Sequence, residues 1–122
     1  MSINSRQKGA RIERELAQEF RLIGYTARRT AQFCGDAGDS DVVVEELPEL
    51  FIECKGVERL NIWDAMELAV EQAGDKIAAV FHTKNRKPWL VTLQMRDMVA
   101  FSLLLSRNGV KPSEKESVKG ST

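Results

Sequence analysis

The sequence is poor in the residues that build disulfide or zinc frameworks. Two cysteines, Cys34 and Cys54, and one histidine, His82, are spread over 122 residues. Neither cysteine belongs to a C-x-x-C pair, so a structural zinc site is not expected. Two cysteines also do not form a disulfide framework, which favours a reducing, cytoplasmic location.

Long apolar stretches are also missing. No run approaches the ~20 residues that a membrane-spanning helix needs, so we expect no membrane partner. The opening MSINSRQKGARIERE is polar and charged, which predicts no secretory signal. The length suits a single core. We therefore expect one domain over residues 1–107 and a flexible tail over residues 108–122, where the composition is typical of disorder.

The net charge is zero, but the charges are unevenly distributed. Residues 1–34 hold seven Lys/Arg and three Asp/Glu, residues 35–73 hold two and eleven, and residues 74–122 hold nine and four. An acidic middle between basic arms is expected where carboxylates hold a metal ion and cations hold phosphate. A mixed, solvated surface would have the same composition.

Apolar periodicity and turn residues predict the order α-β-β-β-α-β-β-α. Helices are expected over about 5–22, 62–73 and 96–105, and strands over 25–30, 41–46, 50–55, 76–83 and 89–93. The second and third strands are expected to pair as a hairpin, joined near Leu47-Pro48-Glu49. The prediction is an α/β fold with a mixed central sheet flanked by helices.

The third strand carries two charges where a core strand would be apolar. Side chains alternate across a strand, so Glu53 and Lys55 share one face while Cys54 faces the core. In a hairpin, Asp41 at the start of the second strand would lie beside Glu53. Two carboxylates and the backbone carbonyl of Cys54 would suit Mg²⁺, with Mn²⁺ as a substitute. A lysine beside them can position a water for attack on a phosphodiester.

The same charges could form an ordinary salt bridge on a solvated strand. The combination favours a site: a Gly/Asp-rich loop, CGDAGDS, an aspartate at a strand start, and then E-x-K followed by glycine. Asp39 has the same strand parity as Asp41 and is an alternative ligand.

The first helix places one carboxylate near its buried face. The apolar stripe of this helix comprises Ile12, Leu16, Phe20 and Ile23. At 100° per residue, Glu13 lies roughly 50° from the centre of the stripe, Glu19 about 70° and Glu15 about 110°. A carboxylate at the edge of a buried face needs a partner. That partner is either a cation such as Arg14 or the metal site, which Glu13 would complete directly or through water.

Basic side chains on three elements are candidates for DNA contacts. They are Lys8, Arg11 and Arg14 on the first helix, Arg28 and Arg29 on the first strand, and Lys84, Arg86 and Lys87 in the loop KNRKP. Such residues would position the phosphate backbone. Basic loops are also common on solvated surfaces, and one strand arginine could pair with the acidic middle. Trp63 and Trp89 could stack on bases, but packing is the expected use of both.

The motifs KGARIERELAQEF, GDSDVVV and FIECKG resemble the PD-(D/E)XK nuclease superfamily. Within it, they are most similar to archaeal Holliday junction resolvases and to related small phage and prophage endonucleases. The K-G-x-x-x-E-R-x-L helix is matched by Lys8, Gly9, Glu13, Arg14 and Leu16, the strand start by Asp41, and E-x-K by Glu53 and Lys55. The likeness covers about residues 6–105.

The resemblance implies a restriction-endonuclease-like fold and Mg²⁺-dependent hydrolysis of DNA phosphodiester bonds, leaving a 5′-phosphate and a 3′-hydroxyl. Its catalytic residues would be Glu13, Asp41, Glu53 and Lys55. It further implies a homodimer acting on branched DNA, in the host cytoplasm if the chain is phage-encoded. The last helix, with Met98, Phe101, Leu104 and Leu105, is the candidate dimer face. Nucleases for flaps, nicks or duplex, and a catalytically silent DNA-binding module, remain open.

Three features depart from the superfamily pattern. Ser40 stands where its name expects a proline before Asp41. Gln72 is the available candidate for a glutamine or lysine that many members carry on the helix after E-x-K. The neutral total charge also makes a large basic face less obvious.

Overall fold

The computed structural model describes residues 2–30 and 41–107. Along them the elements are α1 (Ser2–Leu22), β1 (Ala27–Arg29), β2 (Val42–Val44), β3 (Leu50–Lys55), α2 (Ile62–Ala73), β4 (Ile77–His82), β5 (Leu90–Leu93), η1 (Met95–Asp97) and α3 (Met98–Arg107). This is the predicted order, with the short 3₁₀ helix η1 added before α3. Asp39 and the predicted tail lie outside the described residues.

The strand pairing differs from the predicted hairpin. β1 pairs with β2 in an antiparallel two-stranded sheet, whereas β3, β4 and β5 form a separate sheet in that order. In the latter, β3 and β4 are parallel and β4 and β5 antiparallel. Two consecutive turns, closed by the bonds from Leu47 N–H to the Val44 carbonyl and from Leu50 N–H to the Leu47 carbonyl, separate β2 from β3. Because these two turns replace the single tight reversal of a hairpin, no β2–β3 ladder forms, although the Asp41 N–H donates to the Ile52 carbonyl; the hairpin prediction was wrong.

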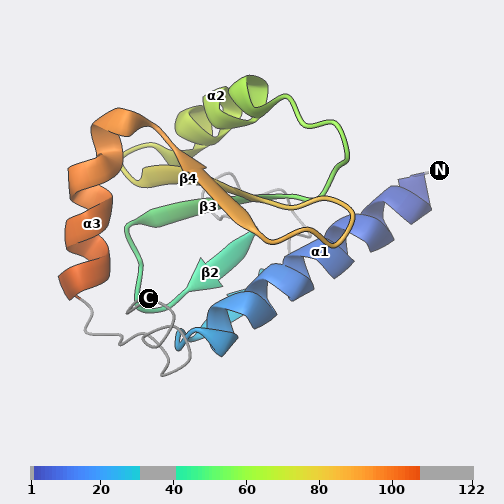
Figure 1. The fold of residues 1–122 in the computed structure, drawn as a ribbon, viewed down its shortest axis with the longest axis horizontal. Helices are drawn as coiled ribbons and strands as arrows, with labels where there is room; N and C mark the ends of the chain where they lie inside the picture. Colours follow the sequence, from blue (N-terminus) through green and yellow to red (C-terminus); the bar gives the residue numbers. More distant parts are fainter. Residues whose placement is uncertain (1, 31–40, 108–122) are drawn as a thin grey trace, which may run out of the picture.

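The three-stranded sheet lies between two helical layers (Figure 1). On one face, Phe51, Ala78 and Val80 pack with the buried side of α2. On the other, Ile52 and Phe81 belong to a second core that includes residues of α1, β1 and β2. Figure 1 shows α1 and α2 on opposite sides of the sheet and α3 beside it. The predicted α/β class, a mixed sheet flanked by helices, is confirmed.

The buried stripe of α1 is shorter than predicted. Ile12, Leu16 and Phe20 are buried, but Ile23 is 40% exposed. α1 ends at Leu22, and the chain turns at Ile23-Gly24 before the periodicity can place Ile23 on the core. Gly24 has a φ of 108°, as expected for a residue that stops a helix.

The candidate dimer face on α3 is part of the core. Leu104 is 4% exposed, and Phe101 and Leu105 pack against the core cluster that contains α1. The expected dimer face was therefore wrong for these three residues, while Met98 is 58% exposed. Within residues 2–30 and 41–107, none of the helices combines the length and apolar character needed to cross a bilayer.

Candidate active site

The four predicted catalytic residues line one open pocket. They are Glu13 from α1, Asp41 next to β2, and Glu53 and Lys55 from β3. The pocket has a volume of about 470 Å³. Three separate parts of the chain therefore bring three carboxylates and one ammonium group to the same place.

Asp41 is held against the edge of β3. Its carboxylate accepts a hydrogen bond from the backbone N–H of Cys54 at 3.1 Å. Its own N–H donates to the carbonyl of Ile52 at 3.3 Å. Because the N–H and C=O of one strand residue point to the same edge, the Cys54 carbonyl also lies on the edge that faces Asp41. This is the carbonyl predicted to accompany the two carboxylates.

Glu53 is a buried carboxylate with a cation beside it. The residue is 8% exposed, and the Lys55 Nζ lies 3.4 Å from its Oε2. Burial raises the pKa of Glu53, the negative charge of Asp41 raises it further, and Lys55 opposes both. The net rise means that one ammonium group does not fully compensate the buried negative charge.

Glu13 is paired with a cation, which was one of the two expectations, and this cation is Arg29 of β1 and not Arg14. The Arg29 Nε of β1 lies 2.8 Å from the Glu13 Oε1. Burial raises the pKa of Glu13, the bond from Arg29 opposes that rise, and the charge of Asp41 adds to it. The negative charge of Asp41 therefore raises the pKa of both Glu13 and Glu53. Pairing of a strand arginine was considered from the sequence, but its partner is on α1 and not in the acidic middle.

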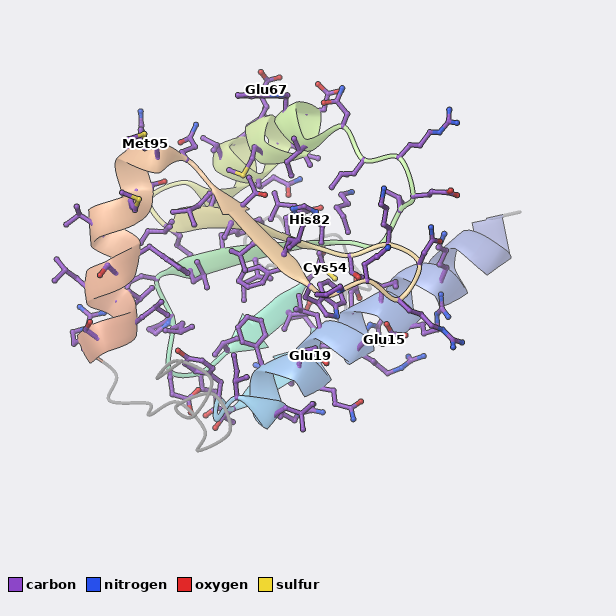
Figure 2. All side chains as sticks on the ribbon, viewed as in Figure 1. Glu15, Glu19, Cys54, Glu67, His82 and Met95 are labelled. Carbon is purple, nitrogen blue, oxygen red and sulfur yellow. The ribbon has the colours of Figure 1, made fainter. Side chains whose placement is uncertain are left out.

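The pocket offers oxygen donors and no reactive thiolate. Cys54 is 9% exposed, and burial strongly raises the pKa of its thiol, so it stays protonated in the core. Figure 2 shows Cys54 where α1 crosses the sheet. Among the described residues, no group of three or more His, Cys, Asp and Glu side chains is arranged to hold a metal ion. Mg²⁺ needs fewer, since it is usually held by one or two carboxylates with several waters. Asp41, Glu53 and the Cys54 carbonyl fit that requirement.

Five of the predicted DNA-binding residues line a second, larger cleft. They are Lys8, Arg11, Lys84, Arg86 and Lys87. This cleft, of about 870 Å³, lies between α1 and the β4–β5 connection and shares Lys8, Ile12 and Gly56 with the catalytic pocket. Glu15, Glu19 and Glu58 also line it, so its charge is mixed. Arg14 and Arg28 are exposed but are not part of its wall.

The glycine that follows E-x-K has a structural role that the sequence did not assign. Gly56 follows E-x-K, and a Cβ placed on it would lie 2.6 Å from the Cδ1 of Ile12. The end of β3 and α1 therefore approach as closely as a glycine allows. The signal was the glycine after E-x-K, but its partner could not be inferred without the fold.

Two further sequence expectations concern side chains outside the pocket. Trp89 packs against the core as expected, whereas Trp63 is 82% exposed and the expectation of packing was wrong. Trp63 lies at the start of α2 and is not among the residues that the helix buries, which are Ala65, Met66, Ala69 and Ala73. Gln72 is exposed on α2 and is not among the residues that line the catalytic pocket.

Comparisons with known proteins were made at the level of sequence and of structure. No family model matches the chain, and no curated protein matches it. Among solved structures, the chain is similar to Hjc, a Holliday junction resolvase from the archaeal hyperthermophile Archaeoglobus fulgidus. The identity is 25% and the TM-score 0.48, over 70% of this chain and 72% of the resolvase. The sequence motifs resemble the same class of protein.

Proposed function

We propose that this chain is a Mg²⁺-dependent DNA endonuclease that acts on branched DNA, with the four-way junction as its preferred substrate. The observation that supports this most is the meeting of Glu13, Asp41, Glu53 and Lys55 in one pocket. A cleft with five cations opens from that pocket, which suits a substrate that carries phosphates.

Asp41, Glu53 and the carbonyl of Cys54 would hold the ion. When bound, Mg²⁺ supplies Lewis-acid stabilisation of charge on the phosphate. Lys55 lies beside Glu53 and would orient the attacking water and steady the developing charge through its ammonium protons. Arg29 would hold the Glu13 carboxylate in place, so that Glu13 completes the site directly or through water.

The cations of the larger cleft would position the DNA backbone. Lys8 lines both the cleft and the catalytic pocket, so a strand lying along the cleft would pass the carboxylates. Contacts of this kind fix position without reading sequence. Paired cuts across a four-way junction need two sites, and the active species would be a homodimer working on DNA in the cytoplasm.

Cleavage of end-labelled DNA tests the proposal. Four-way junction, flap, single-stranded and linear duplex substrates are compared in Mg²⁺, Mn²⁺ and EDTA, for the unchanged chain and for Glu53→Gln. Glu67→Gln is the matched control, because Glu67 is exposed on α2, away from Cys54 in Figure 2. We expect symmetric junction cuts that are lost in EDTA and in Glu53→Gln but kept in Glu67→Gln.

Other outcomes have distinct meanings. Equal cutting of all substrates would keep the nuclease and remove the junction preference. Tight binding without cutting would assign the chain to the silent DNA-binding modules. Equal activity of Glu53→Gln and the unchanged chain would show that the assignment of the catalytic carboxylates is wrong.

A further inference from the structure

The connection between β4 and β5 is a tight turn with an unusual residue. The N–H of Lys87 donates to the carbonyl of Lys84 at 2.8 Å, which leaves Asn85 and Arg86 as the two central residues. Their φ angles are 48° and 61°. Two central residues with positive φ are typical of a type I′ hairpin turn, which favours Asn followed by Gly. Asn85 fits this rule, but Arg86 occupies the glycine position.

An arginine at that position has a conformational cost. The left-handed region brings its Cβ close to the backbone, and glycine avoids this contact. Strained residues persist where a functional side chain is needed. Arg86 therefore points to a use for its guanidinium group, which lines the basic cleft.

The turn stands between two grooves. On one side is the basic cleft that also contains Lys8 and Arg11 from α1. On the other is a groove of about 630 Å³, whose apolar lining residues are Val57, Leu60, Ile62, Pro88 and Leu90. The residues that line both grooves are Glu58, Thr83, Lys84, Lys87 and Pro88. In Figure 1 the β4–β5 connection, drawn in yellow to orange, extends beside α1.

Both grooves reach the catalytic pocket. The basic cleft shares Gly56 with it, and the apolar groove shares Val57, the next residue. The turn therefore divides two paths that meet beside Lys55. A single linear duplex would need only one of them.

The two grooves differ in chemistry. The basic cleft holds Lys8, Arg11 and Arg86, which suit phosphates. The second groove combines aliphatic side chains with Lys84 and Lys87 at the shared wall. Apolar surface beside cations suits a single strand, since unpaired bases expose flat apolar faces while the backbone needs positive charge.

We propose that the Lys84–Lys87 turn separates the two strands that diverge at a DNA branch. The basic cleft takes the backbone of the paired arm, and the apolar groove takes the strand that leaves this arm, which is unpaired in a flap or splayed arm and unstacked at the crossover of a four-way junction. This inference rests on the proposed function and deepens it, because it assigns the preference for branched over linear DNA to one turn of this chain.

Binding measurements in EDTA test the turn independently of cleavage. Affinities for splayed-arm DNA and for linear duplex of equal length are measured by fluorescence anisotropy. The main variant is Leu90→Asp, which places a negative charge in the apolar groove. Its control is Val91→Asp, because Val91 is also exposed on β5 but is not part of that groove. Arg86→Gly is the second variant, and Arg96→Ala its control, since Arg96 is an exposed cation outside both grooves.

We expect Leu90→Asp to lower the ratio of splayed-arm to duplex affinity at least about fivefold, because an apolar contact with a base is lost and a negative charge is placed near the phosphates. Val91→Asp should leave the ratio unchanged. Arg86→Gly should weaken binding of both substrates, because Arg86 lines the cleft that takes the paired arm, while its melting temperature stays the same or rises, because glycine relieves the positive φ. An unchanged or higher melting temperature would show that the change in affinity comes from the missing side chain and not from a loss of the fold.

The inference would be overturned if the ratio of splayed-arm to duplex affinity were the same in Leu90→Asp, Val91→Asp and the unchanged chain. An unchanged affinity for both substrates in Arg86→Gly would also overturn it, because the turn would then make no contact with the paired arm. If no substrate is cut but the ratio responds as expected, the proposed nuclease function fails and the inference stands. If branched DNA is cut but the ratio never responds, the function stands and the inference fails.

Discussion

The carboxylate of Asp41 accepts a hydrogen bond from the backbone N–H of Cys54 at 3.1 Å. In a regular sheet, a backbone carbonyl of the neighbouring strand would accept this bond. Asp41 is therefore both a structural acceptor and the first of the proposed metal ligands. The two roles have different chemical requirements. The bond needs only an oxygen acceptor, whereas a divalent cation needs negative charge.

This difference predicts distinct effects for two substitutions of Asp41. Asp41→Asn keeps an acceptor for the Cys54 N–H, so the free energy of unfolding should change little. Its cleavage rate should fall by at least about a hundredfold, because the ion that supplies several kcal/mol is held less well. Asp41→Ala should lose activity equally and also about 1–3 kcal/mol of stability, since a buried N–H is left without its acceptor. Urea unfolding and junction cleavage measure both; similar stabilities of the two variants would contradict the structural role.

Glu53 should destabilise the metal-free protein at neutral pH. Its pKa in the fold is raised above 4.5 by burial and by Asp41, so the folded state holds this proton more tightly than the unfolded state. The contribution of Glu53 to stability is then present below pH 4.5 and is lost as pH rises through the raised pKa. Glu53→Gln should therefore raise the melting temperature in EDTA at pH 7.

The comparison with pH 4 serves as a control, because the unchanged carboxyl is protonated there and the difference between the two proteins should shrink. A Glu53→Gln protein that melts lower at pH 7 than the unchanged chain would show that the Lys55 pair outweighs the cost of burial. Differential scanning calorimetry at both pH values gives the answer.

A divalent ion should reverse the order of the two melting temperatures, so that the unchanged chain becomes more stable than Glu53→Gln. An ion that binds only the folded state stabilises it by about 1.4 kcal/mol when its concentration is ten times its dissociation constant. Mg²⁺ or Mn²⁺ should therefore raise the melting temperature of the unchanged chain and have little effect on Glu53→Gln. The melting temperatures of both proteins are compared in Ca²⁺-free buffer with added Mg²⁺ and in the same buffer with EDTA. Equal shifts in both proteins would place the ion elsewhere.

Gly56 should couple the end of β3 to α1. A Cβ at this position would lie 2.6 Å from the Ile12 Cδ1, so Gly56→Ala requires Ile12 or the helix to move. Overpacking of this kind typically costs about 1–3 kcal/mol. In the double variant with Ile12→Ala, the space left by the smaller side chain should accept the new methyl group. Urea unfolding of all four proteins should show that the two changes are less costly together than their sum. Additive effects would mean that the approach is not tight.

The sequence was sufficient for features that depend on local pattern. Alternation along β3 placed Cys54 in the core and Glu53 with Lys55 on the other face, and helical spacing placed Glu13 near the edge of the buried stripe. These periodicities survive folding because they follow from backbone geometry alone.

The features that were missed depend on contacts between distant segments. The pairing of Glu13 with Arg29 joins residues 16 positions apart, and the preference of β2 for β1 over β3 depends on which strand reaches an open edge first in space. Nothing local distinguishes a hairpin of β2 and β3 from two separate sheets. Likewise, the exposed side of α3 was misjudged because helical spacing gives a face but not its partner.

The separation of β1–β2 from the three-stranded sheet has a consequence for dynamics. Asp41 adjoins the end of the β1–β2 sheet and Glu53 lies on β3, the edge strand of the other sheet, so an ion held by both would add a further link to the hydrogen bonds that already join Asp41 to β3. Opening of the small sheet would then require release of the ion. The amide protons of Val42–Val44 should exchange with solvent more slowly when Mg²⁺ is added, while those in the middle of β4 should be unaffected, because both edges of that strand are already paired.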